Sequence, residues 1–291
     1  MTKVMNDKNV HSKIEDLTKF LSEEINSKLG KRVHSLMYVG SYAKGKISKS
    51  RPDINYVLIW EVRGTADDYL TLGKILTEAT SKFLKHFVIR PEFRPFKFGY
   101  PIQRKMYEVF INISCLNSVD NNQKFFLPDY VLDGFKHSRK MIFGTDVFGN
   151  MEFNVTKQGL LAGAMQKLAS HKIQLDRIPL VYNLDKDIDL VFNESLDHGK
   201  NLAYFGVEVA MSEEEIKKKD YLTVIEDKSR LLEFYEQGFP PPATAALKII
   251  LDSRDHYREW KNDWGHAVEV YKAAFMLHGL LAGLVEKQIN K

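Results

Sequence analysis

A glycine-bracketed basic loop between two apolar segments constrains the fold of this chain more than any other part of its 291 residues. Residues 33–39 and 54–62 are predicted as strands, because both are largely apolar and turn residues separate them. Gly40 and Gly45 bracket the loop. Its basic side chains are Lys44, Lys46, Lys49 and Arg51. Because glycine has no Cβ and lets backbone amides approach an anion, the loop is suited to hold a triphosphate.

The acidic positions after the loop are suited to a metal ion, with one departure. Asp53 stands at the head of the second predicted strand, where it can hold a divalent cation that bridges phosphates. A second carboxylate is expected two residues later, on the same face of the strand, because side chains alternate with period two. The chain has Asn55 there instead. An amide oxygen can ligate Mg²⁺ but brings no charge, and hard cations prefer carboxylates.

Length and composition set the remaining bounds. The 44% hydrophobic and 27% charged residues are typical of a soluble globular protein, and the length suits two domains. The single cysteine, Cys115, excludes an intramolecular disulfide and suits a reducing interior. The polar N-terminus and the absence of an apolar stretch of about 18 residues predict a cytoplasmic protein without a membrane segment. The net charge of +4 leaves room for an anionic ligand but disfavours nucleic acid as a partner.

Helical and extended patterns divide the chain into two parts. Before residue 147, helices are predicted at 13–29 and 65–86 and further extended stretches at 87–96 and 106–115. Later segments are helical, with a capping box at Ser212. They are predicted at 129–140, 156–171, 221–237, 243–263 and 264–290. The pattern predicts an α+β fold, with a small mixed-sheet domain over residues 1–150 and a helical, bundle-like domain over 151–291 that closes the cleft.

The segment of residues 40–45, Gly-Ser-Tyr-Ala-Lys-Gly, followed by Pro-Asp-Ile-Asn at 52–55, resembles a known signature. It is similar to the Gly-Ser and Asp-x-Asp or Asp-x-Glu pattern of the polymerase-β-type nucleotidyltransferase superfamily. The length and the helical second half are similar in character to the aminoglycoside (kanamycin-type) branch. The strong resemblance covers residues 33–62, and a weaker one, ending in Ile-Phe-Gly-Thr-Asp, extends to residue 146.

The resemblance implies a reaction and roles for individual residues. Gly40 and Ser41 would contact the β- and γ-phosphates of a nucleoside triphosphate, and Asp53 would hold Mg²⁺ or Mn²⁺. An acceptor hydroxyl would attack the α-phosphate with pyrophosphate leaving. Lys44 and Arg51 are candidate phosphate contacts because they raise the local positive charge.

Two glutamates are candidates for the missing charge beside Asn55. Glu108 lies mid-strand where many relatives carry a third carboxylate, so the proposed metal ligands are Asp53, Asn55 and Glu108. The ordinary alternative for Glu108 is a partly exposed residue on an alternating strand. Glu92 is a weaker candidate, because the prolines that flank it indicate an edge strand.

Asn55 keeps several interpretations open. The leading one is transfer of a nucleoside monophosphate to a small-molecule hydroxyl by an enzyme that uses other acids. The second is a catalytically weakened protein that still binds nucleotide or serves as an interaction module. A protein substituted to trap its substrate is also compatible, and a nucleic-acid 3′-end enzyme ranks last. The acceptor and the base preference stay undetermined, and a homodimer is kept open.

Two further segments carry charged patterns. The Asp-x-Asp at residues 185–187 precedes an apolar run but lacks a preceding Gly-Ser, so a solvated loop entering a short apolar segment is the preferred interpretation. Residues 252–260 are charged and aromatic, with like-charged pairs four residues apart. A solvated surface with pairs to another helix is preferred there over the lining of a polar cleft.

Overall fold

The computed structural model describes residues 7–46, 53–83, 87–92, 109–117 and 129–289. The chain divides into two compact units. The first comprises residues 1–127 and 135–151, and the second comprises residues 128–134 and 152–291. The predicted domains were residues 1–150 and 151–291. The observed units differ from this division because residues 128–134 belong to the second unit. Strands lie only in the first unit within the described part of the chain, and the predicted α+β class is confirmed.

A five-stranded mixed sheet forms the centre of the first unit, in the order β3-β4-β2-β1-β5. The strands are β1 (Val33–Val39), β2 (Asp53–Trp60), β3 (Phe87–Glu92), β4 (Val109–Asn117) and β5 (Arg139–Gly144). β1 is antiparallel to both β2 and β5, whereas β4 is parallel to β2 and β3. The sheet is therefore mixed, as the alternating pattern predicted.

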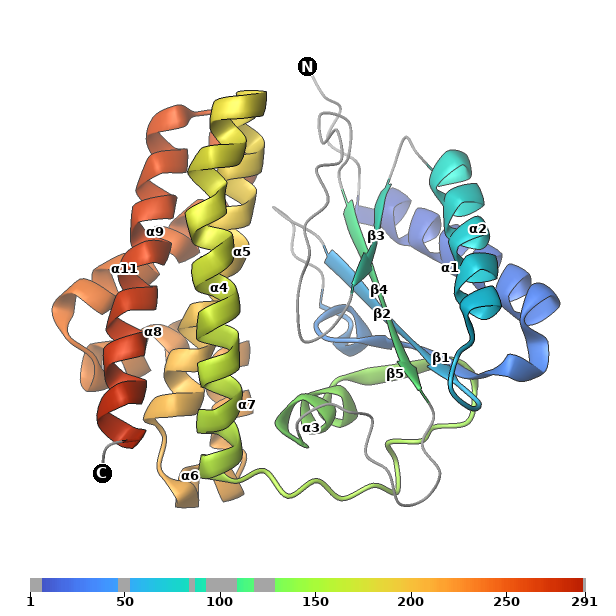
Figure 1. Cartoon of the computed structure of the whole chain (residues 1–291), viewed down its shortest axis with the longest axis horizontal. Helices are drawn as coiled ribbons and strands as arrows, with labels where there is room; N and C mark the ends of the chain where they lie inside the picture. The colour runs from blue at the N-terminus through green and yellow to red at the C-terminus, as the bar shows by residue number, and fades with distance from the viewer. Residues whose placement is uncertain (1–6, 47–52, 84–86, 93–108, 118–128, 290–291) are drawn as a thin grey trace. The chain divides into compact units, whose positions relative to one another are not determined.

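Two helices, α1 (Asp7–Lys28) and α2 (Ala66–Phe83), cover one face of this sheet (Figure 1). Their apolar residues recur every three or four positions, so each helix presents one stripe to the strands. Within β2 the residues facing the helices alternate with those on the other face. The shared core includes Ile14, Leu17, Leu21 and Ile25 of α1, Leu72, Ile75 and Ala79 of α2, and Ile54, Tyr56, Leu58 and Trp60 of β2.

A small hydroxyl cluster lies inside this core. The Thr18 hydroxyl donates to the Ile14 carbonyl at 2.7 Å and contacts the phenol oxygens of Tyr38 and Tyr56, the latter at 2.7 Å. Burial is the main cause that raises the pKa of both phenols, so both stay neutral donors. The cluster ties α1 to both central strands.

The end of the predicted helix at residues 129–140 was wrong, because a strand follows instead. The helix α3 spans Asp129–His137, and Arg139–Gly144 is β5. β5 pairs with β1 from Val39 opposite Arg139 to Ser35 opposite Gly144. Backbone pairing with a strand about 100 residues earlier outweighs the local helical pattern.

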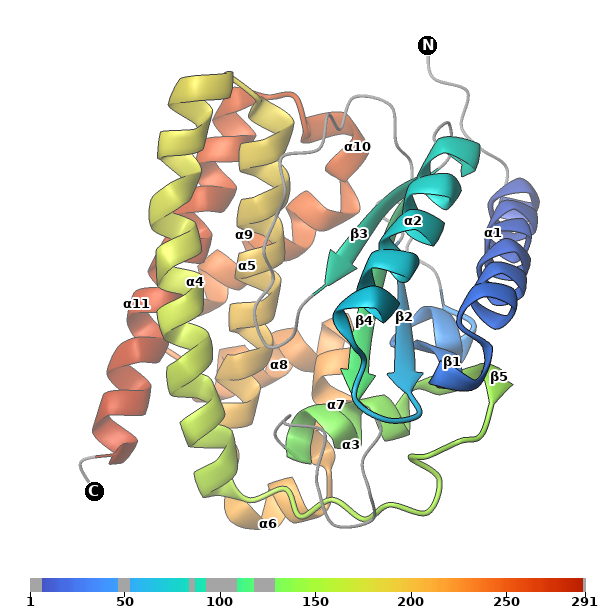
Figure 2. The ribbon, with the colours of Figure 1, turned by 45° about the vertical axis from the view of Figure 1, so that its right-hand side comes forward.

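All the secondary-structure elements in the described part of the second unit are helices. Its elements after α3 are α4 (Lys157–Asp185), α5 (Ile188–Ala210), α6 (Glu213–Lys217), α7 (Asp220–Glu226), α8 (Lys228–Gly238), α9 (Pro241–Asp255), α10 (Tyr257–Trp260) and α11 (Trp264–Ile289). Short 3₁₀ turns in the first unit are η1 (Gly30–Arg32) and η2 (Tyr42–Lys44). The long helices α4, α5, α9 and α11 pack around one apolar core (Figure 2). The capping box at Ser212 is confirmed, since its hydroxyl and Glu215 cap each other's amides.

Three predicted helical boundaries in this unit were wrong. The helix predicted at residues 156–171 continues to Asp185 as α4. The helix α5 begins directly after Asp187, whose carboxylate accepts a hydrogen bond from the Leu190 amide at 3.1 Å. The Asp-x-Asp pattern therefore ends in a two-residue loop, Lys186 and Asp187, as preferred from the sequence, but the apolar segment after it is the start of the long helix α5. The segment 221–237 is broken by Asp227, whose carboxylate caps α8. α9 ends at Asp255 rather than continuing through residue 263.

The charged segment at residues 252–260 pairs with another helix, which is the preferred interpretation from its sequence. Lys228 of α8 contacts Asp255 at 2.6 Å and Asp252 at 3.7 Å. Trp260 is stacked between the imidazoles of His256 and His266, with ring centroids 4.5 and 4.1 Å away. These contacts fix the junction between α9, α10 and α11.

The sequence predicted no segment apolar enough to span a membrane. Judged by length and composition alone, α11 is such a segment, so this prediction was wrong in that respect. This helix has 26 residues and a mean hydropathy of 1.4 in its most apolar window, of which 39% is buried. Core helices of soluble proteins pass the same test. One side of α11, including Ala274, Leu277 and Leu281, lies in the core of the second unit.

Candidate functional site

The predicted phosphate loop and the predicted metal position meet at one edge of the sheet. Since β1 and β2 are antiparallel, the end of β1 lies beside the start of β2. Val39, the last residue of β1, pairs with Asn55. Gly40 and Ser41 follow directly, and Asp53 is the first residue of β2. The strand pairing therefore joins the two parts of the sequence signature.

The loop after β1 is a compact turn that needs both of its glycines. Gly40 has φ +81° and Gly45 has φ +72°, a region that residues with a Cβ rarely adopt. Between them η2 (Tyr42–Lys44) forms a single turn. The carbonyl of Ser41 accepts from the amide of Lys46 at 3.0 Å and closes the turn.

Asn55 lies directly beneath the loop. A Cβ placed on Gly40 would lie 3.5 Å from Nδ2 of Asn55, which is ordinary van der Waals contact. By the alternation along β2, Asn55 is on the opposite face of the sheet from the two helices, and it is half-buried. The turn and the amide side chain are thus close enough to act on one ligand.

Ser138, a residue that the sequence analysis did not identify, holds the loop from the other side. The Gly40 amide donates to the Ser138 carbonyl at 2.8 Å, and the Ser138 hydroxyl oxygen is 3.1 Å from the same amide. Ser138 lies between α3 and β5, so no local pattern near the loop could have indicated it. The Gly40 amide is consequently used within the fold, and Gly40 contributes its conformation and its lack of a side chain.

The base of the loop is braced by an ion pair. Arg139, opposite Val39 in the sheet, contacts Asp146 at 2.7 Å. The hydrogen bonds from Arg139, assisted by the Phe148 and Gly149 amides, lower the pKa of Asp146. The carboxylate therefore stays charged and keeps the corner after β5 closed.

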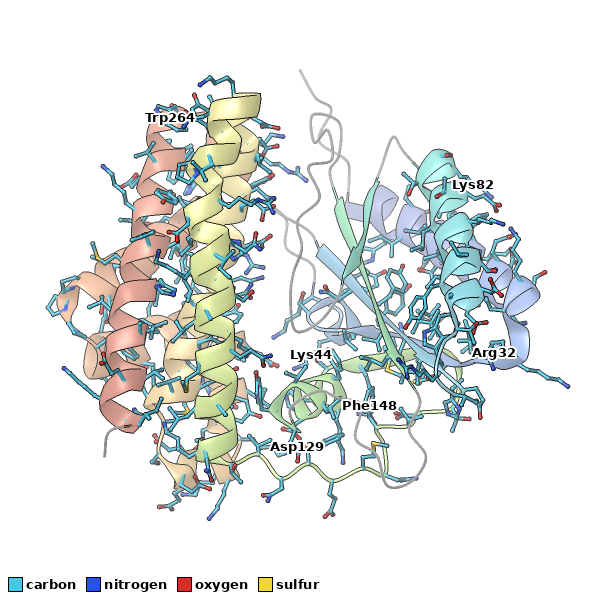
Figure 3. The ribbon with its side chains drawn as sticks, viewed as in Figure 1. Arg32, Lys44, Lys82, Asp129, Phe148 and Trp264 are labelled. Atoms are coloured by element: carbon cyan, nitrogen blue, oxygen red, sulfur yellow. The ribbon has the colours of Figure 1, made fainter. Side chains whose placement is uncertain are left out.

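Tyr42 anchors the loop on its other flank. Its ring packs edge-on against Tyr38, with centroids 4.9 Å apart, and stacks on His11 at 5.8 Å. Burial raises the pKa of Tyr42 to about 12, so the phenol is neutral at physiological pH. Lys44 belongs to the same turn and lies at the opposite end of β1 from Arg32 (Figure 3).

The structure describes only part of the predicted metal site. Arg51 and Glu108 lie outside the described residues, and for Asp53 and Glu92 only the backbone is described. Among the described side chains, no group of three or more His, Cys, Asp or Glu could hold a metal ion. The set of Asp53, Asn55 and Glu108 therefore stays a prediction.

The strand β4 brings a further segment to the same edge. β4 is parallel to β2, and its Phe110 and Asn112 are in register with Asp53 and Asn55. β4 begins at Val109, directly after Glu108 in the sequence. Carboxylate and amide oxygens of this kind are ligands that Mg²⁺ accepts, so the residue types fit a divalent cation.

Comparison with known proteins gives a likeness in structure alone. No family model matches the chain, and no curated protein matches it. The fold is similar to the crystal structure of spectinomycin adenyltransferase AAD(9) from Enterococcus faecialis with ATP and spectinomycin. The match has a TM-score of 0.51 at 10% identity and covers 90% of this chain and 98% of that one. The chain therefore has a fold similar to that of this adenyltransferase, in agreement with the fold that the resemblance of its Gly-Ser loop implied.

Proposed function

We propose that this protein is a nucleotidyltransferase that moves a nucleoside monophosphate from a nucleoside triphosphate to a hydroxyl of a small molecule. The observation that carries the proposal is the pairing of Val39 with Asn55, which sets Gly40 and Ser41 beside the start of β2 at Asp53. The similarity to an adenyltransferase solved with ATP and spectinomycin supports it.

The residues of the loop have distinct proposed tasks. The exposed Ser41 hydroxyl and the first amides of η2 would donate to the β- and γ-phosphates. Lys44, together with Arg51, would offset the phosphate charge. Gly40 would leave the space above Asn55 open to the ligand, since any side chain there would occupy it.

A divalent cation, Mg²⁺ or Mn²⁺, would be held by Asp53 and Asn55, with Glu108 as the third ligand. When bound, it supplies positive charge to the phosphates. The acceptor oxygen forms a bond to the α-phosphorus while the bond to the bridging oxygen breaks. Pyrophosphate leaves, and the hydroxyl proton passes to a base.

Asn55 favours a second candidate function. A neutral ligand in place of a carboxylate weakens charge stabilisation in the transition state, on the order of 100-fold in rate. A protein of this kind would bind nucleotide and turn it over slowly or not at all. The amide beneath Gly40 is the specific feature that supports this alternative.

Calorimetry with ATP and Mg²⁺ tests the part that both candidates share. We expect binding with a dissociation constant between about 1 μM and 1 mM, the usual range for enzyme substrates. Each of the four nucleoside triphosphates is titrated, because the base preference is undetermined. The absence of binding to all four would refute both candidates.

Asn55→Asp separates the two candidates through pyrophosphate release in the presence of a panel of aminoglycoside and aminocyclitol acceptors. Release by the unchanged protein supports the enzyme, whereas release only by the variant supports the weakened site. Asn150→Asp is the matched control, because Asn150 is exposed in a turn and is not one of the predicted site residues. Adding Asp53→Asn to the Asn55→Asp variant should remove any gain.

A further inference from the structure

The side chain of Arg139 bonds two acceptors at the corner that holds the loop after β1. Its Nε and Nη2 atoms donate to the carboxylate of Asp146 at 2.8 and 2.7 Å. Its Nη1 atom donates to the Lys136 carbonyl. A guanidinium carries its donors in one rigid plane, so a single side chain can hold both acceptors at once. We call Arg139, the Asp146 carboxylate and the Lys136 carbonyl the Arg139 clamp.

Ser138 lies inside this clamp, because it stands between Lys136 and Arg139 in the chain. The Ser138 amide donates to the Phe135 carbonyl at 3.2 Å, so the backbone makes a tight turn at the end of α3. The Ser138 carbonyl accepts from the Gly40 amide at 2.8 Å. The Arg139 side chain closes a ring over the turn, from the Lys136 carbonyl to its own backbone. The direction of the Ser138 carbonyl therefore depends on Arg139.

Asp146 holds the guanidinium in place from the far side. Its carboxylate also accepts from the Phe148 amide at 3.1 Å and from the Gly149 amide at 3.2 Å. The hydrogen bonds from Arg139, with these amides, keep the pKa of Asp146 below its usual value, so the carboxylate is charged at neutral pH. A charged acceptor that is itself bonded by two amides gives the guanidinium a fixed partner.

The strand register brings the clamp to the level of the candidate site. Val39 pairs with Asn55 on one side and with Arg139 on the other. Register partners lie on the same face of a sheet, so Arg139 and Asn55 share the face opposite α1 and α2. They are two strand spacings apart, about 10 Å. The loop that follows Val39 therefore begins between Asn55 and the clamp.

We propose that Arg139 is a positioning residue for the nucleotide loop. It acts through Ser138 on Gly40, and so fixes the donors of Ser41 and η2 before the nucleotide arrives. Donors that are already ordered bind an anion more tightly, because ordering them on binding costs free energy. The inference rests on the proposed function, since it assigns the loop to a triphosphate.

Arg139→Lys in the full-length protein tests the inference. Lysine keeps the positive charge, but its ammonium lacks the planar fork that bonds the Asp146 carboxylate and the Lys136 carbonyl together. Calorimetry is done with Mg²⁺ and the nucleoside triphosphate that the unchanged chain binds most tightly. We expect its dissociation constant to rise about tenfold or more. Hydrogen exchange of the Gly40 amide, followed by NMR without nucleotide, should accelerate because its bond to Ser138 opens more often.

Arg32→Lys is the matched control. Arg32 lies at the opposite end of β1 from the loop, and its guanidinium makes the same two kinds of contact. It donates to the carboxylate of Asp68 at 2.8 Å and to the carbonyl of Arg63 at 3.3 Å. The control should lower the urea midpoint of unfolding but leave the triphosphate affinity and the Gly40 exchange unchanged. The comparison separates positioning of the loop from general stabilisation.

Equal dissociation constants for Arg139→Lys and Arg32→Lys would overturn the inference, as would Gly40 exchange that Arg139→Lys leaves unchanged. If Arg139→Lys does not fold, Asp146→Asn decides. Its amide gives Arg139 no negative charge, so we expect a rise of about threefold in the dissociation constant, and an unchanged value would overturn the inference. Failure of the unchanged chain to bind any triphosphate would refute the proposed function. The hold of the clamp on the loop is then decided by the Gly40 exchange, which needs no nucleotide.

Discussion

The Gly40 amide donates a hydrogen bond of 2.8 Å to the Ser138 carbonyl, across 98 residues of sequence. The bond ties the turn after β1 to the corner between α3 and β5. It also removes that amide from the set of donors available to a phosphate. The position of the loop therefore depends on β5 being in place, and Ser41 and η2 are left as the donors to an anion.

Ser138→Ala should have little effect on the loop. The backbone carbonyl keeps the shorter bond to Gly40 at 2.8 Å, and the substitution removes the hydroxyl contact to the same amide at 3.1 Å. We expect a loss of about 0.5 kcal/mol in the free energy of unfolding, measured with urea, and ATP affinity within about twofold. A larger loss of affinity with unchanged stability would instead assign the hydroxyl to nucleotide binding.

Gly144→Ala should be far more damaging than Gly45→Ala, although both glycines have similar positive φ angles of +83° and +72°. A Cβ at Gly144 would lie 2.1 Å from the His34 carbonyl oxygen, whereas one at Gly45 has no atom within 4 Å. We expect a loss of about 4 kcal/mol or more for Gly144→Ala and about 1 kcal/mol for Gly45→Ala, by urea unfolding. Equal losses in the free energy of unfolding for the two variants would show that the strain of a positive φ angle, and not the contact with His34, explains both effects.

Asp68→Asn should destabilise the first unit at neutral pH. The carboxylate accepts from Arg32 at 2.8 Å and from both the amide and the hydroxyl of Thr65 at 2.8 Å. Losing charged hydrogen bonds of this kind costs about 1–3 kcal/mol in the free energy of unfolding. Asp67→Asn, on the exposed neighbour, is the control and should cost about 0.5 kcal/mol or less.

The same carboxylate predicts a pH dependence. Hydrogen bonds from Arg32 and from the Thr65 amide hold the pKa of Asp68 well below its usual value. The unfolded carboxyl titrates near pH 3.9, so the stabilisation is complete above about pH 5 and declines as the pH falls toward the lower pKa of the folded state. Urea unfolding at pH 7 and pH 3 should show the Asp68→Asn difference shrinking in acid. A difference that stays constant would contradict this assignment.

Thr18→Val should destabilise the protein more than Thr18→Ser. Valine keeps the shape but removes the hydroxyl that contacts the buried phenols of Tyr38 and Tyr56, and these then lose a partner. We expect a loss of about 1–3 kcal/mol for valine and about 1 kcal/mol for serine, from urea unfolding. Equal losses would show that the methyl group of Thr18 matters more than its hydroxyl.

Some features followed from local chemistry and were predicted correctly. The capping box at Ser212 depends on two side chains three residues apart, and α11 from Trp264 on has a long apolar repeat. The turn between Gly40 and Gly45 was visible because both glycines are needed at positive φ. In each case the deciding contacts lie within a few residues of sequence.

Other features depend on distant contacts and were missed. β5 forms because Arg139–Gly144 pairs with β1, and α4 continues to Asp185 because its residues pack on the core of the second unit. Neither the strand pairing nor that packing can be predicted from the amino acids of the segment itself. Lys228, which pairs with Asp252 and Asp255, likewise lies on a separate helix.

The sequence by itself determined the α+β class, the glycine-bracketed turn and the candidate residues Ser41, Asp53 and Asn55, because strand alternation and glycine chemistry are local. Only the tertiary structure decided that Nδ2 of Asn55 lies 3.5 Å from where a Cβ on Gly40 would be. It also decided that the Ser138 carbonyl accepts a hydrogen bond from the Gly40 amide. It also decided that Phe275 and Met276 stay exposed on α11. These relations arise from strand register and helix packing, which join residues that the sequence keeps far apart.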